Sequence, residues 1–489
     1  MKQGDDLYQL IRTLSIPEKR YFRLFAQRHV IGEKNSYEVL FDLVDAQVQK
    51  GIYNEQDVKK KLPAKAATHL AAGKHYLYEL ILRSMRGFHE NKSRRDAIHQ
   101  RLIDIRFLMD KGLYAKSRQF IQSAKKDALE IEYFAGLIEL LYLERRMLRL
   151  SLDKDADTTF SDISALEQDA LQKISDELFY RTLYDQNFVL LQEKYTPAER
   201  EDLSRIRIGT IQQKTRATSF NAMALHYSIL ADDAQLRRKF DEARSFMREV
   251  VQLFEEAPLM RAEQSQRYIN VLSNYLNSCF LARDFSDFQP VLRTLAKIKP
   301  QKEEEEVLLF RSRYMLELLY YMNQSDWTRA EKLFPDIRSG LKRFAGRLPE
   351  GSVLVLHYNM ATVYFMQRNY AKSLDSFVFI TDSASKNIRR DLQKNAQLLQ
   401  IVVHYELEHF NLVKSMLLNL KRRLQKDTIT TLEQIIIQLL NKLTDTPDKK
   451  EKQQLYVQAD EALQTIAAGS KNIQGLEELR FWISKYLPA

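Results

Sequence analysis

Three asparagines in the segment RYINVLSNYLNSCF (267–280) form the most specific polar pattern in this sequence. Asn270, Asn274 and Asn277 recur at i, i+4 and i+7, a spacing that places their amides on one stripe of a helix. Each amide can both donate and accept hydrogen bonds, which suits the backbone of an extended or helical peptide. Asparagine is also a poor helix former, so three of them on one face lower the stability of the helix. The stripe is a candidate peptide-binding surface, with an ordinary solvated face as the alternative.

Motifs for catalysis and metal binding are incomplete throughout the sequence. The segment GRLPEGS (346–352) has the glycine spacing of a phosphate-binding loop but no lysine after its second glycine. Asp153, Asp155 and Asp157 have the spacing of calcium ligands, but the turn glycine and final glutamate of a calcium loop are missing. His404 and Glu408 are spaced like half of a metal site on one helical turn, without a third ligand. We therefore expect no catalytic residue, no metal and no cofactor, and a packed side chain at His404.

Basic residues gather near the N-terminus. The net charge is +10, and residues 1–100 contain 18 Lys and Arg against 12 Asp and Glu. Residues 54–86 are predicted to form a helix, a break at Pro63 and a second helix, an order typical of a DNA-binding helix–turn–helix. The candidate nucleic-acid contacts are Lys59, Lys60, Lys61, Lys65 and Lys74. Because the second helix carries an apolar face, we expect that helix to be buried, and a solvated basic surface is the favoured interpretation.

Composition indicates a folded chain built from helices. Of 489 residues, 45% are hydrophobic and 29% charged, while only 13 are glycine and 10 proline. Few turn-forming residues over such a length predict long helices with short connections, and no segment alternates strictly between apolar and polar residues. A single cysteine, Cys279, fits a reducing compartment. No uncharged apolar run reaches the length of a membrane span, and Asp5 and Asp6 stand where a leader would be apolar. We expect a cytoplasmic protein without membrane insertion.

A short motif recurs along the chain, as in GLYAKSRQF (112–120) and RNYAKSLDSF (368–377). Each copy has an aromatic residue, a mostly small residue three positions later and an apolar residue seven positions later. From Phe240 to Phe410, successive aromatic residues of the motif are separated by 45, 42, 43 and 40 residues. The aromatic residues are Tyr114, Phe240, Phe285, Trp327, Tyr370 and Phe410.

The motif predicts a helical hairpin. The residue six positions before each aromatic is expected near the end of a first helix, and the aromatic opens a second helix after a short polar turn. The small residue allows the two helices to approach closely, and the apolar residue lies on the same face one turn later. We expect Trp327 and Tyr370 to be buried between paired helices. Because one hairpin cannot bury its own apolar face, neighbouring hairpins must stack.

This pattern resembles the tetratricopeptide repeat. The best match is NMATVYFMQRNYAKSLDSF, in which Ala361, Tyr364, Tyr370, Ser373 and Phe377 fall at the signature positions of that family. The resemblance implies an all-α, right-handed superhelical solenoid of helix hairpins whose first helices line a concave surface. Phe288 and Val413 replace the small residue in two copies, and the period exceeds the usual 34 residues of the family, so longer helices are expected.

Four segments are expected: an N-terminal helical module (1–95), degenerate repeats (96–215), tetratricopeptide-like repeats (216–445) and C-terminal capping helices (446–489). The first segment resembles the N-terminal region of bacterial helical-repeat proteins, a likeness that brings no known activity with it. In the capping segment, LEELRFWISKYL is expected to cover the last repeat.

A solenoid of this kind implies binding and not catalysis. We expect a scaffold or adaptor that holds a protein or peptide on its concave face. Further candidate contacts on later first helices are Tyr358, Thr362 and Asn395. The alternative is a cytoplasmic regulator that binds nucleic acid through residues 1–95 and senses a peptide through its repeats.

Overall fold

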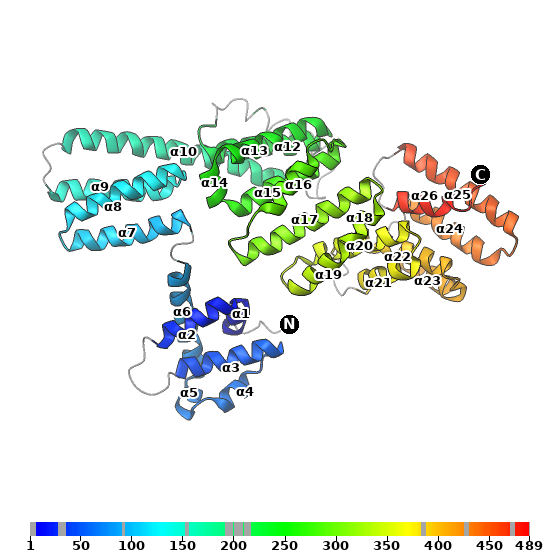
Figure 1. Cartoon of the computed structure of the whole chain (residues 1–489), viewed down its shortest axis with the longest axis horizontal. Helices are drawn as coiled ribbons and strands as arrows, with labels where there is room; N and C mark the ends of the chain where they lie inside the picture. The colour runs from blue at the N-terminus through cyan, green and yellow to red at the C-terminus, as the bar shows by residue number, and fades with distance from the viewer. Residues whose placement is uncertain are drawn as a thin grey trace. The chain divides into compact units, whose positions relative to one another are not determined.

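The computed structural model describes residues 6–27, 36–89, 93–151, 156–190, 199, 209, 217–382, 388–424, 430–469 and 475–488. Within these ranges the chain is helical and contains no strand, which confirms the all-α class (Figure 1). None of the described helices is long and apolar enough to cross a membrane.

The chain folds into two compact units. Unit 1 comprises residues 1–182 and 216–222, and unit 2 comprises residues 183–215 and 223–489. This division is coarser than the four expected segments, and the first boundary falls inside a long helix, α10. The helices up to that point are α1 (Asp6–Thr13), α2 (Ile16–Gln27), α3 (Ser36–Lys50), α4 (Glu55–Lys61), α5 (Ala64–Thr68), α6 (Leu70–His89), α7 (Arg94–Asp110), α8 (Tyr114–Glu130), α9 (Phe134–Ser151) and α10 (Ala156–Leu190).

The remaining helices run almost without interruption to the end of the chain (Figure 1). They are α12 (Phe220–Leu236), α13 (Phe240–Glu256), α14 (Pro258–Glu263), α15 (Ser265–Ala282), α16 (Phe288–Lys297), α17 (Glu303–Asn323), α18 (Trp327–Lys332), α19 (Phe334–Arg343), α20 (Glu350–Met366), α21 (Tyr370–Thr381), α22 (Arg390–Glu406), α23 (Phe410–Leu424), α24 (Thr431–Asp445), α25 (Lys449–Gly469) and α26 (Leu476–Ser484).

Helices α1 to α6 share one apolar core in unit 1. The core includes Ile11, Phe22, Phe41 and Ile81, all of them fully buried. Helix α2 begins with the expected cap: the Ser15 backbone N–H donates to the Glu18 carboxylate over 2.7 Å, and the Glu18 N–H donates back to the Ser15 hydroxyl over 3.4 Å. Helix α6 packs on α1, α2 and α3, so its apolar face is buried as the sequence predicts.

The connections between paired helices share one hydrogen-bond pattern. In seven described turns, the N–H directly before the aromatic residue donates to the carbonyl six positions before that aromatic, over 2.8–3.1 Å. The residue two positions before the aromatic adopts a positive φ. Both features define the Schellman motif, which ends a helix and satisfies its last carbonyls. The positive-φ residues are Gly112, Glu132, Arg238, Arg283, Ser325, Arg368 and Glu408.

Side chains in the hairpin motif are buried as their spacing predicts. The small residue is at most 3% exposed, at Ser117, Ala243, Ala330 and Ser373. The apolar residue is at most 7% exposed, at Ile121, Met247, Leu292, Phe334, Phe377 and Leu417. Phe288 and Val413, which replace the small residue, are fully buried as well. The motif therefore describes the contact surface between the two helices of each pair.

Three features of the turns differ from expectation. Trp327 and Tyr370 are only half-buried, because each opens its helix at the edge of the hairpin, and the residues further along the helix fill the interior. An additional turn occurs at Glu132, where Phe134 opens α9. Phe285 lies before its helix, since α16 begins three residues later at Phe288.

Helix pairs in unit 2 pack against their neighbours in sequence order. We call the helix before each turn the first helix and the helix after it the second helix. The first helices contact one another in series, α15 with α17, α17 with α20 and α20 with α22, and α22 also contacts α24. Each second helix also contacts the first helix that follows it, as α13 does with α15 and α21 does with α22. Unit 2 is thus built by adding similar pairs.

Candidate functional site

The three asparagines of α15 lie side by side on its exposed face. Asn270, Asn274 and Asn277 are exposed, while their neighbours Val271 and Tyr275 are buried. None of the three amides has a hydrogen-bond partner among the described residues of the chain. Three amides therefore face solvent with both their donors and their acceptors available. We call these three residues the asparagine stripe.

A partly exposed polar network connects α15 to α13 and to the turn that follows α15. The Tyr275 hydroxyl donates to Asp287 over 2.8 Å, in the segment that follows α15. Arg244 of α13 pairs with Asp284 over 2.9 Å and donates to Ser286 over 3.0 Å. Burial raises the pKa of Tyr275, and its hydrogen bond to Asp287 raises the pKa further, so the phenol stays protonated and donates. These bonds tie α13, α15 and the next turn together and keep the stripe on a fixed surface.

Parts of this polar pattern recur on later first helices, with two of the three positions polar on α20 and one on α22. Asn270 and Asn395 each lie 15 residues before the aromatic of their turn, Phe285 and Phe410. By the same count, Asn274 matches Asn359 and Asn277 matches Thr362, which are on α20. On α20 and α22 these positions are at most 8% exposed, whereas on α15 they are open. Amide and hydroxyl groups thus occupy equivalent positions on three first helices.

The other three predicted contacts are buried against the chain's own C-terminal helix. Tyr358, Thr362 and Asn395 are between 3% and 8% exposed, so they do not line an open groove in this structure. The Asn395 amide donates to the Tyr358 hydroxyl, which in turn donates to Glu478 of α26 over 3.4 Å. Burial raises the pKa of Tyr358 well above its usual value. The expected open surface is replaced here by an occupied one.

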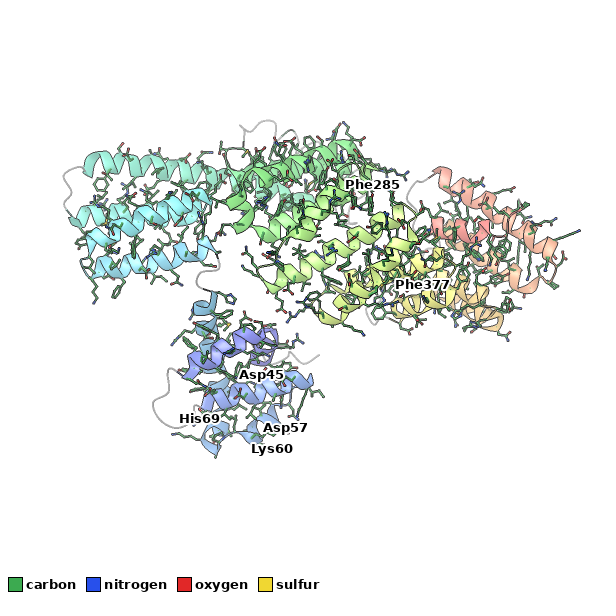
Figure 2. The ribbon with its side chains drawn as sticks, in the orientation of Figure 1. Asp45, Asp57, Lys60, His69, Phe285 and Phe377 are labelled. Carbon is green, nitrogen blue, oxygen red and sulfur yellow. The ribbon has the colours of Figure 1, made fainter. Side chains whose placement is uncertain are left out.

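The predicted nucleic-acid residues fall into two groups. Lys59, Lys60, Lys61 and Lys65 are exposed at the end of α4 and the start of α5, and Figure 2 shows Lys60 at the same end of the module as Asp57. Lys74 is instead paired with Glu55 over 2.6 Å and lies over the ring of Tyr53. Burial lowers the pKa of Lys74. Nucleic-acid binding by this module stays a prediction from the sequence.

Metal binding finds no support among the described residues, which contain no group of three His, Cys, Asp or Glu able to hold an ion. The expected helical spacing of His404 and Glu408 is wrong, since α22 ends at Glu406 and Glu408 adopts a positive φ of 62°. His404 is packed, as expected, with its Nδ1 3.1 Å from Nδ1 of His409. Asp153 and Asp155 lie outside the described residues.

A cavity of about 450 Å³ opens between α16, α17 and α19. Its walls include the aromatic ring of Phe310 and two polar pairs, Arg343 with Glu306 and the Tyr314 hydroxyl with Asp336. The polar side chains of each pair bind each other. The arrangement provides no nucleophile with an adjacent base.

Sequence reasoning missed the residues that fasten α26 to α20 and α22. Glu406 and Glu478 carry these contacts and belong to none of the motifs. The available signal was the four-residue spacing of Glu478, Trp482 and Tyr486, which puts the three on one face of a helix. No protein-family model, curated protein or solved structure matches this chain.

Proposed function

We propose that unit 2 is a right-handed α-solenoid of tetratricopeptide-like hairpins and that the protein is a non-enzymatic scaffold or adaptor that binds a protein or peptide. The repeated Schellman turns and the serial packing of first and second helices support the solenoid. In such a stack the first helices line the concave face, which places the asparagine stripe on the binding surface. The buried single cysteine, Cys279, fits a cytoplasmic protein.

The observation that carries this proposal is the recurrence of polar groups at equivalent positions on α15, α20 and α22. On α22 the matching Asn395 lies against Gly475 at the start of α26, and Tyr358 of α20 contacts Glu478 of the same helix. On α15 the same face is open, with three unengaged amides. A surface that holds a helix in one place and repeats its polar pattern in another is suited to bind a peptide there.

The loss of peptide-binding free energy expected on removing the stripe can be estimated from its three amides. A hydrogen bond contributes about 1 kcal/mol net, so three contacts contribute about 3 kcal/mol, or about a hundredfold in the dissociation constant. Alanine is the better helix former, so replacing all three asparagines leaves the free energy of unfolding equal or raises it by roughly 1 kcal/mol. Loss of binding without loss of stability is therefore the signature of this function.

The test uses a peptide selected from a random display library on the immobilised full chain. Its dissociation constant is measured for the wild-type chain, for the chain with all three stripe asparagines changed to alanine, and for a matched control. The control changes three exposed residues at four-residue spacing on the second helix α23, namely Asn411, Ser415 and Asn419. We expect a loss of about a hundredfold in the stripe variant and none in the control. Equal affinity for all three chains would remove the stripe from the proposed site.

A further inference from the structure

Three hydrogen-bond donors from the C-terminal end of the chain converge on one buried carboxylate. Trp482 Nε1 donates to Glu406 Oε1 over 2.7 Å, and the Tyr486 hydroxyl donates to the same oxygen over 2.5 Å. Lys485 Nζ lies 2.6 Å from the other oxygen, Oε2. The Glu406 side chain is 2% exposed, so its negative charge is satisfied almost entirely by these donors. Glu406 is the last residue of α22.

The opposite end of α26 reaches a second polar contact. Glu478 accepts from the Tyr358 hydroxyl of α20, which Asn395 of α22 also contacts. Gly475 precedes α26 with a φ of +83° and lies so close to α22 that a Cβ at this position would be 2.2 Å from Asn395 Oδ1. Only glycine fits both the backbone angle and this approach. Helix α26 packs on α25 and α20 (Figure 1).

The groups that make these contacts form one face of α26 and the turn after it. Glu478, Trp482 and Tyr486 are spaced by four residues. The Trp482 ring is 1% exposed and meets the edges of Tyr405 and Tyr456 at centroid distances of 6.1 and 5.8 Å. In sequence order, the Glu478 carboxylate contacts α20, the Trp482 indole contacts α22 and α25, and the Tyr486 phenol contacts α22.

Contacts of this kind favour selectivity over permanent attachment. Buried hydrogen bonds to charged groups add little net stability, because desolvation offsets most of their attraction, but a wrong partner leaves them unsatisfied at a large cost. Helix α26 has nine residues, too few to be stable as a helix on its own. Its position depends on the three groups and on Leu479 and Ile483, which are fully buried in the same core, so a displacing helix must present apolar residues there as well.

We propose that α20, α22 and α25 form a groove that recognises an amphipathic helix with Glu and Trp four residues apart and a Tyr four residues later in the following turn, and that α26 is an intramolecular occupant which a partner's helix displaces. This inference rests on the proposed binding function and adds the class of partner and a means of regulation. In the unliganded protein α26 occupies the groove, and a partner must displace it to bind. The apparent affinity for the partner is then reduced by the fraction of molecules whose groove is free.

The test is binding of a fluorescein-labelled peptide of residues 475–489, followed by fluorescence anisotropy. The peptide is titrated with the wild-type full chain and with the full-length Trp482→Ala variant, which weakens its own α26 but leaves Tyr358, Asn395 and Glu406 unchanged. We expect at least tenfold tighter binding to the variant, because its groove is free more often. The same peptide with its own Trp482→Ala change is the control and is expected to lose binding.

A second measurement on the wild-type protein keeps the proposal testable if the variant is unstable. In hydrogen–deuterium exchange, α26 amides are expected to exchange at least tenfold faster than those of α22. Equal exchange rates, or no peptide binding to a folded variant, would make α26 a permanent part of the fold and overturn the proposal. A wild-type chain that dimerises through exchanged α26 segments would assign the groove to a second copy and also overturn it. None of these results affects the library-peptide test, because the asparagine stripe lies on α15.

Discussion

Replacing Ser325 with glycine is expected to stabilise unit 2. Ser325 occupies the left-handed conformation of a Schellman turn with a φ of 53°, and its side chain is exposed. A residue with a Cβ loses about 1–2 kcal/mol in this conformation, and glycine avoids that loss. Glycine also has more freedom in the unfolded chain, which costs about 0.5–1 kcal/mol. The net gain is about 0.5–1 kcal/mol in the free energy of unfolding.

Tryptophan fluorescence reports this change, since both tryptophans of the chain, Trp327 and Trp482, lie in unit 2. Guanidinium titrations compare the wild-type chain with Ser325→Gly and with the control Ser325→Ala. Alanine has the same left-handed cost as serine, so the control is expected to leave the unfolding midpoint unchanged. The reasoning is refuted if the glycine and alanine variants unfold at the same denaturant concentration.

Two further predictions concern packing and pH. Gly340→Ala is expected to destabilise the chain by about 1–3 kcal/mol in thermal unfolding, because the added Cβ would lie 1.9 Å from the Phe310 ring. The control is Gly73→Ala, whose Cβ would meet only Leu40 at 3.8 Å. This control is expected to be neutral or stabilising. His357 stacks on a phenylalanine ring, and burial, followed by the charge of Arg338, lowers its pKa from 6.5 to about 4. The unfolded chain therefore binds this proton first, so stability is expected to fall as pH drops from 6.5 towards 4 and to change less in His357→Gln, measured by denaturant titrations across that range. An unchanged pH slope in His357→Gln would contradict the second prediction, and equal melting of the two glycine variants would contradict the first.

Local spacing was sufficient to predict the hairpins. The burial of Ser373 and Phe377 depends on residues within one turn and two helices, and the aromatic, small and apolar pattern reflects that contact directly. The turn at Glu132 escaped notice because Leu137 stands where most copies have a small residue. This turn has the same hydrogen bonds as the others, because they join backbone groups and do not depend on the side chains.

Contacts between distant segments could not be predicted in this way. Tyr358 and Glu478 are 120 residues apart, and no periodicity relates them. The sequence correctly places Tyr358, Thr362 and Asn395 on first helices, but their burial depends on where α26 packs. The asparagine stripe differs from them because no described segment covers it. The spacing of the asparagines predicts that they share one face of the helix, and the exposure of that face depends on the absence of a covering segment.

The most direct test of the central claim, that the face of α15 binds a peptide, is photocrosslinking of the library-selected peptide to the full chain. A benzophenone amino acid replaces Gln266, which is exposed one helical turn before Asn270, and in a second chain it replaces Ser415 on α23. The account predicts crosslinks to the peptide from position 266 and none from position 415. Crosslinks from position 415 alone, or equal yields from both positions, would contradict it.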